Sequence, residues 1–310
     1  MEGIKILATG YYVPPRIVTN ATFEEQLDTS DAWITSRTGI SKRHFVDDQS
    51  NVDIGYAAAM QAIENESIDA AKIGLIIVAT MTPDTFTPST ACLIQERLGL
   101  SQEVIAFDIS AACSGFVYGL TIMERMLSTM PDKYGLLIGS EVLSRSLDFT
   151  DRNTCILFGD GAGAVVVTKS QQLFSSYLDA RGEKEGLYMN AVGTDRYLHM
   201  AGKEIFKFAV QVIPVCIHRV LQQTDLTLES IDFIVCHQAN ARIIKYVYEK
   251  LKCDPHKFYC NVQDYGNTSA ASIPMALAQM DAKGMLQRGM KIICVGFGGG
   301  LTWGATILEW

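Results

Sequence analysis

The feature that most constrains the fold is a repetition of apolar runs between the first and second halves of the chain. The run IGLIIV begins at Ile73, and the similar run IDFIVC begins at Ile231, about half of the chain later. The run KYGLLIGSE at 133–141 matches MKIICVGFG at 290–298 at nearly the same offset. Because matching runs recur in the same order at one offset, we interpret the sequence as an internal duplication.

The repeated runs also indicate the class of fold. Continuous stretches of apolar and β-branched residues, such as 72–80 and 229–238, are typical of strands buried in a parallel sheet. The segments 104–110 and 258–272 each lead into a turn of small residues, and the runs 161–169 and 303–310 correspond as terminal strands. Alternating strands and helices in two similar halves predict an α/β layered sandwich, with helices between or outside two sheets.

We place the boundary between the halves after residue 172, which gives residues 1–172 and 173–310. The boundary region, KSQQLF, contains no run of Pro, Gly or Ser. We therefore expect the two halves to share one interface rather than to move independently.

Composition excludes several classes of protein. The net charge of −8, without a Lys/Arg run, argues against binding nucleic acid through bulk electrostatics. We expect no signal peptide and no membrane span. The eight cysteines form no C-x-x-C pair, so zinc-ribbon and thioredoxin interpretations fail. A cytoplasmic protein with reduced thiols fits these observations best.

Three residues are candidates for catalysis. Cys113 stands where an apolar strand gives way to a segment with near-helical spacing of apolar residues, and a helix N-terminus favours a thiolate. His237, in CHQAN, lies at the carboxyl end of a buried strand, and Asn267 lies in YGNTSAAS. Alone, each has an ordinary explanation: a small buried thiol, a histidine satisfied at a strand end, and a turn residue. Together they suit acyl-thioester chemistry.

The glycine-rich stretches limit the classes of enzyme to which the chain can belong. The stretch GFGGG at 296–300 permits close approach of the backbone and can offer N–H groups to an oxyanion, although it also suits a tight turn. The stretch GDGAGA at 159–164 lacks the G-x-G-x-x-G spacing, and the chain contains no G-x-S-x-G elbow. A dehydrogenase and a serine hydrolase are therefore disfavoured.

At this point the sequence resembles a known family, the β-ketoacyl-acyl-carrier-protein synthase III enzymes of the thiolase superfamily. The resemblance covers essentially the whole chain and is carried by TSDAWITSRTGISKRH, PSTACLIQ, AACSGF, GDGAGA, HQANARI, YGNTSAAS and GFGGGLTWG. It implies a thiolase-like layered α-β-α-β-α sandwich built from two similar halves. It also implies a condensing enzyme of fatty-acid initiation.

The resemblance implies a role for each candidate residue. Cys113 is acylated by an acyl-CoA, and malonyl-loaded acyl carrier protein then loses CO₂. His237 and Asn267 stabilise the resulting enolate, while the backbone N–H groups of Cys113 and Gly299 hold the oxyanion. The resemblance implies no metal or redox cofactor, acyl-CoA as a substrate and acyl carrier protein as a partner. It also implies a homodimer.

The resemblance further assigns residues that bind the substrates. The expected contacts with CoA and pantetheine come from Trp33, Arg37, Arg152, Asn240 and Gly202. The expected acyl pocket consists of Thr87, Leu157, Met200 and Phe297, and the expected docking residues for the carrier protein are Arg242 and Lys207. Trp33 and Arg152 are expected to sandwich adenine, and Asn240 is alternatively a helix N-cap.

Thr87 stands where several members of the family have a phenylalanine from the partner subunit, so the length of the starter stays open. Three other functions also stay open. A polyketide-type or secondary-metabolite synthase would use the same three residues with a different acceptor. A non-catalytic scaffold would typically have lost one of them, and a cysteine peptidase would hydrolyse amides.

Overall fold

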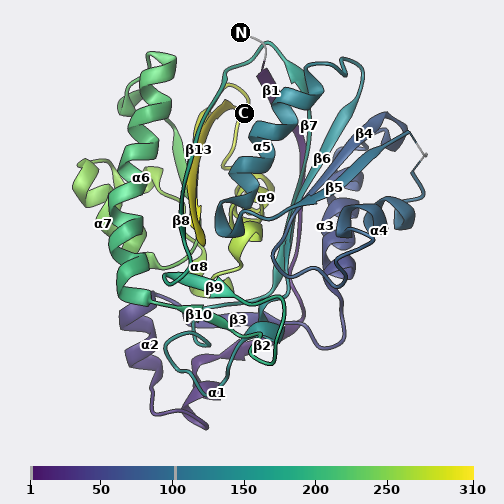
Figure 1. The fold of residues 1–310 in the computed structure, drawn as a ribbon. Helices are drawn as coiled ribbons and strands as arrows, with labels where there is room; N and C mark the ends of the chain where they lie inside the picture. Colours follow the sequence, from purple (N-terminus) through teal and green to yellow (C-terminus); the bar gives the residue numbers. More distant parts are fainter. Residues whose placement is uncertain (1–2, 101–102) are drawn as a thin grey trace.

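Two mixed β-sheets lie on either side of a central pair of helices in the computed structural model, which describes residues 3–100 and 103–310 (Figure 1). The strand order of the first sheet is β1 (Gly3–Tyr12), β7 (Gly161–Ser170), β6 (Tyr134–Glu141), β4 (Ile73–Ala79) and β5 (Ile105–Ile109). The strand order of the second sheet is β11 (Phe233–Cys236), β12 (Lys291–Gly298), β13 (Gly300–Glu309) and β8 (Phe174–Glu183).

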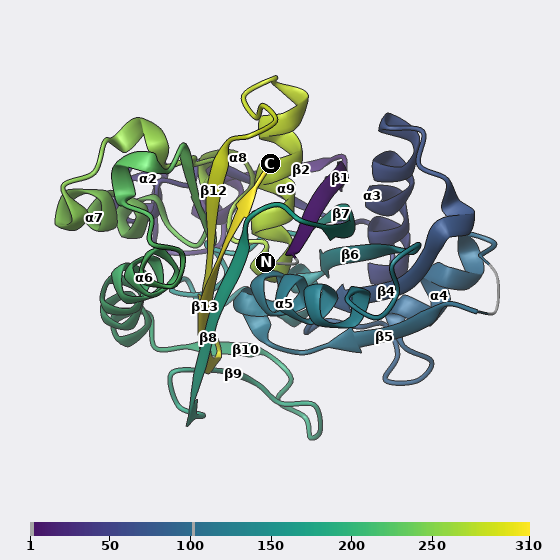
Figure 2. The same ribbon diagram turned by 90° about the horizontal axis from the view of Figure 1, so that it is seen from above.

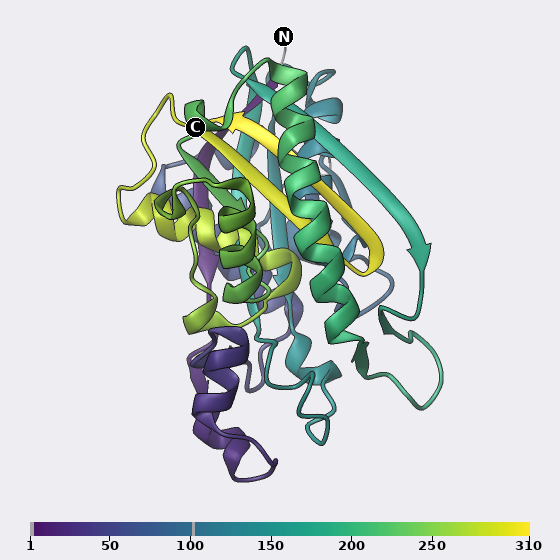
Figure 3. The same cartoon turned by 90° about the vertical axis from the view of Figure 1, so that its left-hand side faces the viewer.

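Six helices complete the layers (Figures 2 and 3). The central helices are α5 (Gly115–Leu127) and α9 (Ser272–Ala282). The outer face of the first sheet is covered by α3 (Asn51–Asn65) and α4 (Thr90–Arg97), and that of the second by α6 (Gly202–Thr224) and α7 (Ala241–Leu251). The order of layers is therefore α-β-α-β-α, as the family resemblance implies.

Shorter elements extend from one end of the sandwich. They are β2 (Arg16–Thr19), α1 (Asn20–Glu24), α2 (Asp31–Thr38), β3 (Lys42–Phe45), β9 (Leu187–Met189), β10 (Leu198–Met200) and α8 (Val262–Tyr265). None of the helices within residues 3–100 and 103–310 is long and apolar enough to cross a bilayer.

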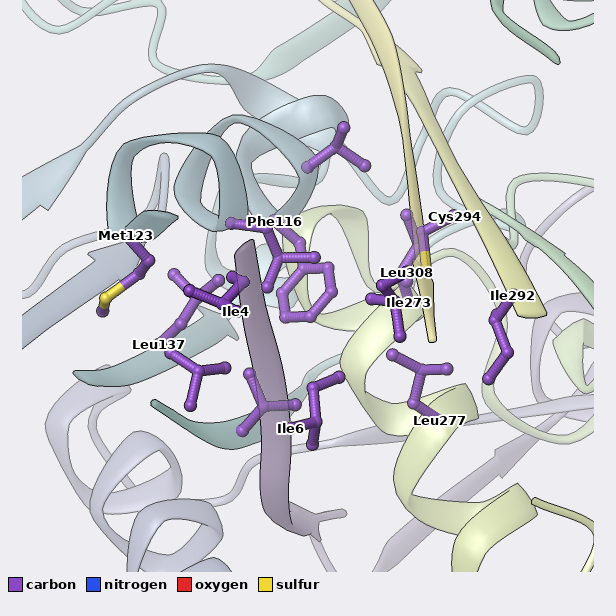
Figure 4. Close-up of a cluster of buried hydrophobic side chains, with 14 of the residues drawn as sticks. Ile4, Ile6, Phe116, Met123, Leu137, Ile273, Leu277, Ile292, Cys294 and Leu308 are labelled. Atoms are coloured by element: carbon purple, nitrogen blue, oxygen red, sulfur yellow. The ribbon is translucent and has the colours of Figure 1, made fainter. Parts of the chain in front are cut away.

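The central layer forms the largest contact between the halves (Figure 4). Phe116 of α5 and Ile273 and Leu277 of α9 lie among Ile4 of the first sheet and Leu308 of the second. Every residue of α9 from Ser272 to Met280 is buried, as expected for a helix enclosed on all sides. Each fully buried aliphatic or aromatic side chain contributes about 1.5–3 kcal/mol, so this layer joins the two sheets firmly.

The strands confirm most of the predicted elements. β4 pairs in parallel with both β5 and β6, and β11 pairs in parallel with β12, as the continuous apolar runs predict. The terminal strands β7 and β13 are antiparallel to their neighbours. All strands of the first sheet precede residue 171, and all strands of the second follow residue 173.

One expected correspondence is incomplete. The segment 104–110 contains β5, whereas its partner segment at 258–272 forms two isolated bridges, one between Phe258 and Ile234 and one between Asn267 and Phe158. That segment then turns into α8, a short 3₁₀ helix at Ser269–Ala271, and α9. The second sheet consequently has one strand fewer, because this stretch of chain is used to build the turn that contains Asn267.

Close packing between sheet and helix generates a first prediction. A methyl group at Gly163 of β7 would lie 2.4 Å from the backbone nitrogen of Met275 in α9, whereas one at Gly182 of β8 would meet no atom within 4 Å. We expect Gly163→Ala to lower the free energy of unfolding by about 1–3 kcal/mol and Gly182→Ala to change it by less than about 0.5 kcal/mol. Urea unfolding of both variants measures this, and equal losses would contradict it.

Candidate active site

A cavity of about 710 Å³ lies where the two halves meet, and it collects most of the residues singled out from the sequence. The predicted site residues that line it are Trp33, Arg37, Cys113, Leu157, Met200, Gly202, His237, Asn240, Asn267 and Phe297. The three catalytic candidates are therefore brought together from segments far apart in the chain.

Cys113 occupies the turn between β5 and α5. A short 3₁₀ helix at Ala112–Ser114 follows the strand, and α5 begins at Gly115, so the predicted place of the thiol before a helix is confirmed. The preceding Ala112 has φ of 44°, in the left-handed region. A methyl group at Gly298 of β12 would lie 3.0 Å from the Cys113 nitrogen. Glycine at that position therefore lets the second half approach the thiol.

The state of this thiol differs from the expectation. The sequence predicts a lowered pKa at the helix N-terminus, whereas burial raises the pKa of Cys113 to about 12. The side chain is 4% exposed, a hydrogen bond with Ser269 opposes the shift, and the charge of Glu141 adds to it. Loss of hydration therefore outweighs the helix end, and the resting thiol is protonated.

His237 follows β11, and hydrogen bonds fix both its backbone and its ring. Its backbone N–H donates to the Val295 carbonyl at 2.7 Å, and its Nδ1 lies 2.7 Å from Ser272 Oγ. The Gln238 N–H donates to the same hydroxyl oxygen at 3.3 Å, which favours donation of the Ser272 proton to Nδ1. That arrangement leaves Nε2 protonated, and burial lowers the pKa of His237 to about 3, so the ring is neutral.

Asn267 is fixed by the backbone of the first half. Its N–H donates to the Leu157 carbonyl at 2.8 Å, and its own carbonyl accepts from the Gly159 N–H at 3.0 Å. The side-chain Oδ1 accepts from the Ser269 N–H at 2.8 Å. Because the oxygen already has a partner, the Nδ2 amino group is the end available to a substrate oxygen.

Gly299, the predicted oxyanion donor, lies at the boundary between two cavities. Gly298 lines the first cavity, and Gly299 lines a second one of about 810 Å³. Thr302 Oγ1 lies 3.1 Å from the Ala111 carbonyl and 3.0 Å from the Gly299 carbonyl. This hydroxyl connects the glycine turn to the segment that precedes Cys113.

The side chains predicted to bind the nucleotide lie at the exposed end of the first cavity. Two of them, Trp33 and Arg152, contact each other and leave no space for a base between them. The Arg152 guanidinium lies over the Trp33 ring at 5.2 Å from the centroid and donates to the Asp28 backbone oxygen. An adenine stacked between them needs a separation of about 7 Å, twice a van der Waals contact. Arg152 must therefore move aside before a base can enter.

Asn240 and Arg37 are linked to each other beside this pair. Asn240 caps α7, since its Oδ1 accepts from the Arg242 N–H at 2.8 Å, and its amide donates to the Arg37 carbonyl at 3.1 Å. The alternative role as an N-cap is thus confirmed, and the residue also lines the cavity.

The two predicted docking residues are exposed beside the mouth. The Arg242 guanidinium lies over the Phe206 ring at 5.7 Å, and Lys207 pairs with Glu204 at 2.9 Å. Phe206 and Glu204 line the first cavity. The cationic groups therefore stand next to the cavity rather than inside it.

Three of the four residues of the predicted acyl pocket line the first cavity, and Thr87 lines neither cavity. Phe297 packs edge-to-face against His237 with ring centroids 5.1 Å apart, and Leu157 and Met200 line the same cavity. Thr87 is one residue beyond Phe86, which lines the second cavity and is 83% exposed. Within one chain, Phe86 thus lines the second cavity, and Thr87 lines neither cavity.

The sequence did not identify three side chains behind the site. Ser269 and Ser272 occur in the quoted stretch YGNTSAAS, where they read as turn residues, and Glu141 ends the run KYGLLIGSE. A carboxylate at the end of a buried apolar strand was the available signal for Glu141. Among the described residues, no cluster of three His, Cys, Asp or Glu side chains is arranged to hold a metal ion.

Comparison with known proteins extends these observations. The family model 3-oxoacyl-[acyl-carrier-protein] synthase III matches residues 107–183, and the model of its C-terminal part matches residues 221–310. The β-ketoacyl-[acyl-carrier-protein] synthase III of Clostridium beijerinckii is 47% identical, and the alignment covers 100% of both chains. That of Clostridium acetobutylicum is 44% identical over 100% of this chain and 99% of its own.

Solved structures show the same fold. The crystal structure of 3-oxoacyl-[acyl-carrier-protein] synthase III from Aquifex aeolicus VF5 superposes with a TM-score of 0.95 at 43% identity, over 99% of this chain and 100% of that one. The priming β-ketosynthase of the R1128 polyketide pathway gives a TM-score of 0.93 at 32% identity, over 99% and 96%.

The similarity extends over the whole length and over both sheets, and it places the protein among the condensing acyltransferases with a thiolase-like fold. Within that class, the chain belongs to the β-ketoacyl-[acyl-carrier-protein] synthase III family.

The burial of His237 generates a second prediction. Because burial holds the pKa of this imidazole near 3, we expect its NMR resonances to stay constant from pH 5 to pH 8. The measurement uses protein labelled at its five histidines, with His237→Ala to assign the signal. A titration midpoint between pH 5 and pH 8 would show that the ring is charged in the working range.

Proposed function

We propose that this protein condenses an acyl-CoA starter with malonyl-loaded acyl carrier protein, giving 3-ketoacyl-acyl carrier protein, CoA and CO₂. The observation that carries the proposal is the meeting of Cys113, His237 and Asn267 in one cavity. The family membership of the chain supports the same reaction. Acyl transfer, decarboxylation and carbon–carbon bond formation involve no net oxidation, so the proposed reaction needs no redox cofactor.

In the first half-reaction, Cys113 attacks the thioester carbonyl of the acyl-CoA, and CoA leaves. The backbone N–H groups of Cys113 and Gly299 are the proposed donors to the oxyanion. A preorganised donor of this kind contributes about 3–4 kcal/mol to the stability of the transition state.

In the second half-reaction, the malonyl thioester loses CO₂, and the resulting enolate attacks the acylated cysteine. The proposed donors to the enolate oxygen are His237 Nε2 and Asn267 Nδ2. A neutral imidazole suits this role, because it donates a hydrogen bond to the enolate oxygen without transferring its proton to that oxygen. The burial of His237 and the occupied Oδ1 of Asn267 support this assignment.

Binding of the two carriers uses the mouth of the cavity. We assign Trp33, Arg37 and Arg152 to the CoA nucleotide, and Asn240 and Gly202 to the pantetheine arm. Arg242 and Lys207 are the proposed contacts for the acidic carrier protein, since cations beside the mouth offset the net charge of −8. The apolar side chains of Leu157, Met200 and Phe297 form the proposed acyl pocket.

We also propose that the protein is a homodimer in a reducing, cytoplasmic compartment. Within the described residues, β5 is an edge strand of the first sheet, and its Ile105 is 45% exposed; Phe86, which lines the second cavity, is 83% exposed. Unpaired apolar strand edges are usually covered in native proteins. All eight cysteines are free thiols, which supports the compartment.

A polyketide-type priming synthase is a second candidate, because the R1128 enzyme shares the fold at 32% identity. The two functions differ in the acceptor that receives the starter. Incubation of the acylated protein with malonyl-loaded carrier protein and with malonyl-CoA, followed by product analysis, separates them. Condensation with the carrier-bound donor of fatty-acid synthesis supports the first function.

The third prediction tests the acyl-enzyme. Intact-protein mass spectrometry after incubation with a panel of short, branched and longer acyl-CoAs should show a gain of one acyl group. The gain should be absent in Cys113→Ala, because no other thiol lines the cavity within the described part of the chain. The same experiment ranks the starters that the acyl pocket accepts.

A matched control is Cys260→Ala, which removes a partly exposed thiol outside the lining of either cavity. We expect it to be acylated like the unmodified protein. Equal labelling of Cys113→Ala, or no labelling with any acyl-CoA, would reject the proposed nucleophile.

The fourth prediction concerns the nucleotide. Stacking of a base on an aromatic ring contributes about 1–3 kcal/mol, so we expect Trp33→Ala to raise KM for acyl-CoA about tenfold with little change in kcat. An acyl-pantetheine substrate, which lacks the nucleotide, should be used equally by both proteins. An equal rise in KM for both substrates would mean that Trp33 shapes the cavity rather than binding adenine.

A further inference from the structure

Two hydroxyl groups lie next to the proposed oxyanion donors. Ser114 follows Cys113 directly and is fully buried, and Thr302 lies on β13, three residues after Gly299. Their oxygens, Ser114 Oγ and Thr302 Oγ1, are 2.6 Å apart, although the residues are 188 positions apart in the chain. We call these two groups the hydroxyl pair. It joins the two halves of the chain beside both donors.

The hydroxyl pair contacts the backbone of both halves. Ser114 Oγ lies 2.7 Å from the Ala111 carbonyl oxygen, which also accepts from the Ser114 N–H at 3.1 Å. Thr302 Oγ1 lies 3.1 Å from the same oxygen and 3.0 Å from the Gly299 carbonyl oxygen. The Ala111 carbonyl of the first half and the Gly299 carbonyl of the second are therefore linked through these hydroxyls.

The two hydroxyls have only two protons for these contacts. At 2.6 Å one proton lies between Ser114 Oγ and Thr302 Oγ1, because two facing lone pairs would repel. The other proton goes to a carbonyl oxygen. If Ser114 is the donor within the pair, Thr302 donates to the Gly299 or Ala111 carbonyl. If Thr302 is the donor, Ser114 donates to the Ala111 carbonyl. Both directions need both hydroxyls.

The turn at Gly299 depends on support from outside itself. β12 ends at Gly298 and β13 begins at Gly300, whose φ of 134° lies in the range that favours glycine. Three glycines in succession supply no side chain to fix the turn. The N–H and the carbonyl of Gly299 belong to neighbouring peptide planes that share one Cα. A contact of Thr302 with that carbonyl therefore restricts the direction of the Gly299 N–H.

The turn before the nucleophile is restricted in the same way. The Ala111 carbonyl and the Cys113 N–H belong to neighbouring peptide planes that share the Cα of Ala112. Ala112 has φ of 44°, a conformation that persists only where the surroundings hold it. A methyl group at Gly296 of β12 would lie 2.8 Å from the Ser114 Cα, so the second half packs closely against this turn.

We propose that the hydroxyl pair sets the separation of the Cys113 and Gly299 N–H groups, so that both donate to one oxyanion. Ser114 and Thr302 are thus positioning residues, and the inference rests on the proposed function. When the Cys113 sulfur bonds to the acyl carbon, the π electrons of the carbonyl move onto its oxygen. They return when the bond from carbon to the CoA sulfur breaks. The two donors belong to different halves, so their separation depends on contacts between the halves.

Three variants separate the contributions of the pair. Thr302→Val keeps the shape of the side chain, but a methyl carbon normally stays about 3.3–3.6 Å from an oxygen, so it pushes the two turns apart. We expect it to slow acylation of Cys113 by about 10- to 100-fold at saturating acyl-CoA, with little change in KM. Thr302→Ser keeps the hydroxyl and should restore the rate. Ser114→Ala leaves Thr302 within reach of both carbonyls and should cost less than about tenfold.

The test compares two reactions of the same thiol, each followed by peptide mass spectrometry at Cys113. Acetyl transfer from acetyl-CoA or from p-nitrophenyl acetate passes through an oxyanion, whereas alkylation by iodoacetamide displaces iodide and forms none. In Thr302→Val we expect both acetylations to be slowed and alkylation to stay within about twofold. Thr306→Val is the matched control, because it removes a buried hydroxyl from the same strand outside the lining of either cavity. It should react like the unmodified protein with all three reagents.

Four results would overturn the proposal. They are unchanged acetylation in Thr302→Val, an equal loss of acetylation and alkylation, failure of Thr302→Ser to restore acetylation, and alkylation without acetylation by p-nitrophenyl acetate in the unmodified protein. An equal loss would mean that the hydroxyl supports the thiol or the fold rather than the donors.

The same experiment distinguishes the proposed function from the proposed pair. p-Nitrophenyl acetate carries no CoA. If it acetylates Cys113 with the expected pattern across the variants while no acyl-CoA of the panel does, the proposed function is rejected and the pair is retained. If acyl-CoA labels Thr302→Val as fast as the unmodified protein, the function is retained and the pair is rejected.

Discussion

The enclosure of α5 and α9 between two sheets is the interaction on which the rest of the structure depends. Both helices are covered on opposite sides by apolar strands, so neither half can bury its own face without the other. Their N-terminal turns lie close together, and these turns contain Cys113 on one side and Ser269 and Ser272 on the other. The same packing that contributes most of the apolar contact between the halves therefore also assembles the site.

Burial then sets the chemical state of each group in that site. Burial favours the neutral form of each group. It therefore explains the protonated thiol of Cys113, the uncharged imidazole of His237 and the raised pKa of the Glu141 carboxyl group. The hydrogen bonds of Ser272 and Ser269 decide which end of each group faces the substrate. An apolar pocket with few, well-placed polar atoms is what a reaction through an enolate requires.

Much of this was predictable from the sequence, and the remainder has a physical reason. The duplicated apolar runs predicted the buried strands of both sheets, because a buried strand needs only local apolar composition. The position of Cys113 before a helix was also predictable, since the change from strand to helix is a local signal. The pKa of that thiol was not predictable, as it depends on how completely Gly298 and the second half exclude water. Glu141 and Ser269 belong to different halves, so their places behind the site required the tertiary structure. The separation of Trp33 and Arg152 depends on a side-chain conformation that no pattern specifies.

The depth of the thiol has a consequence for what the protein encounters in a cell. Cys113 is 4% exposed at the inner end of a cavity whose entrance is flanked by Trp33 and Asn240. For the proposed reaction, the depth of this thiol favours an acyl group carried at the tip of a long, slender tether. Under that proposal, recognition falls first on the tether and only then on the acyl group that it carries.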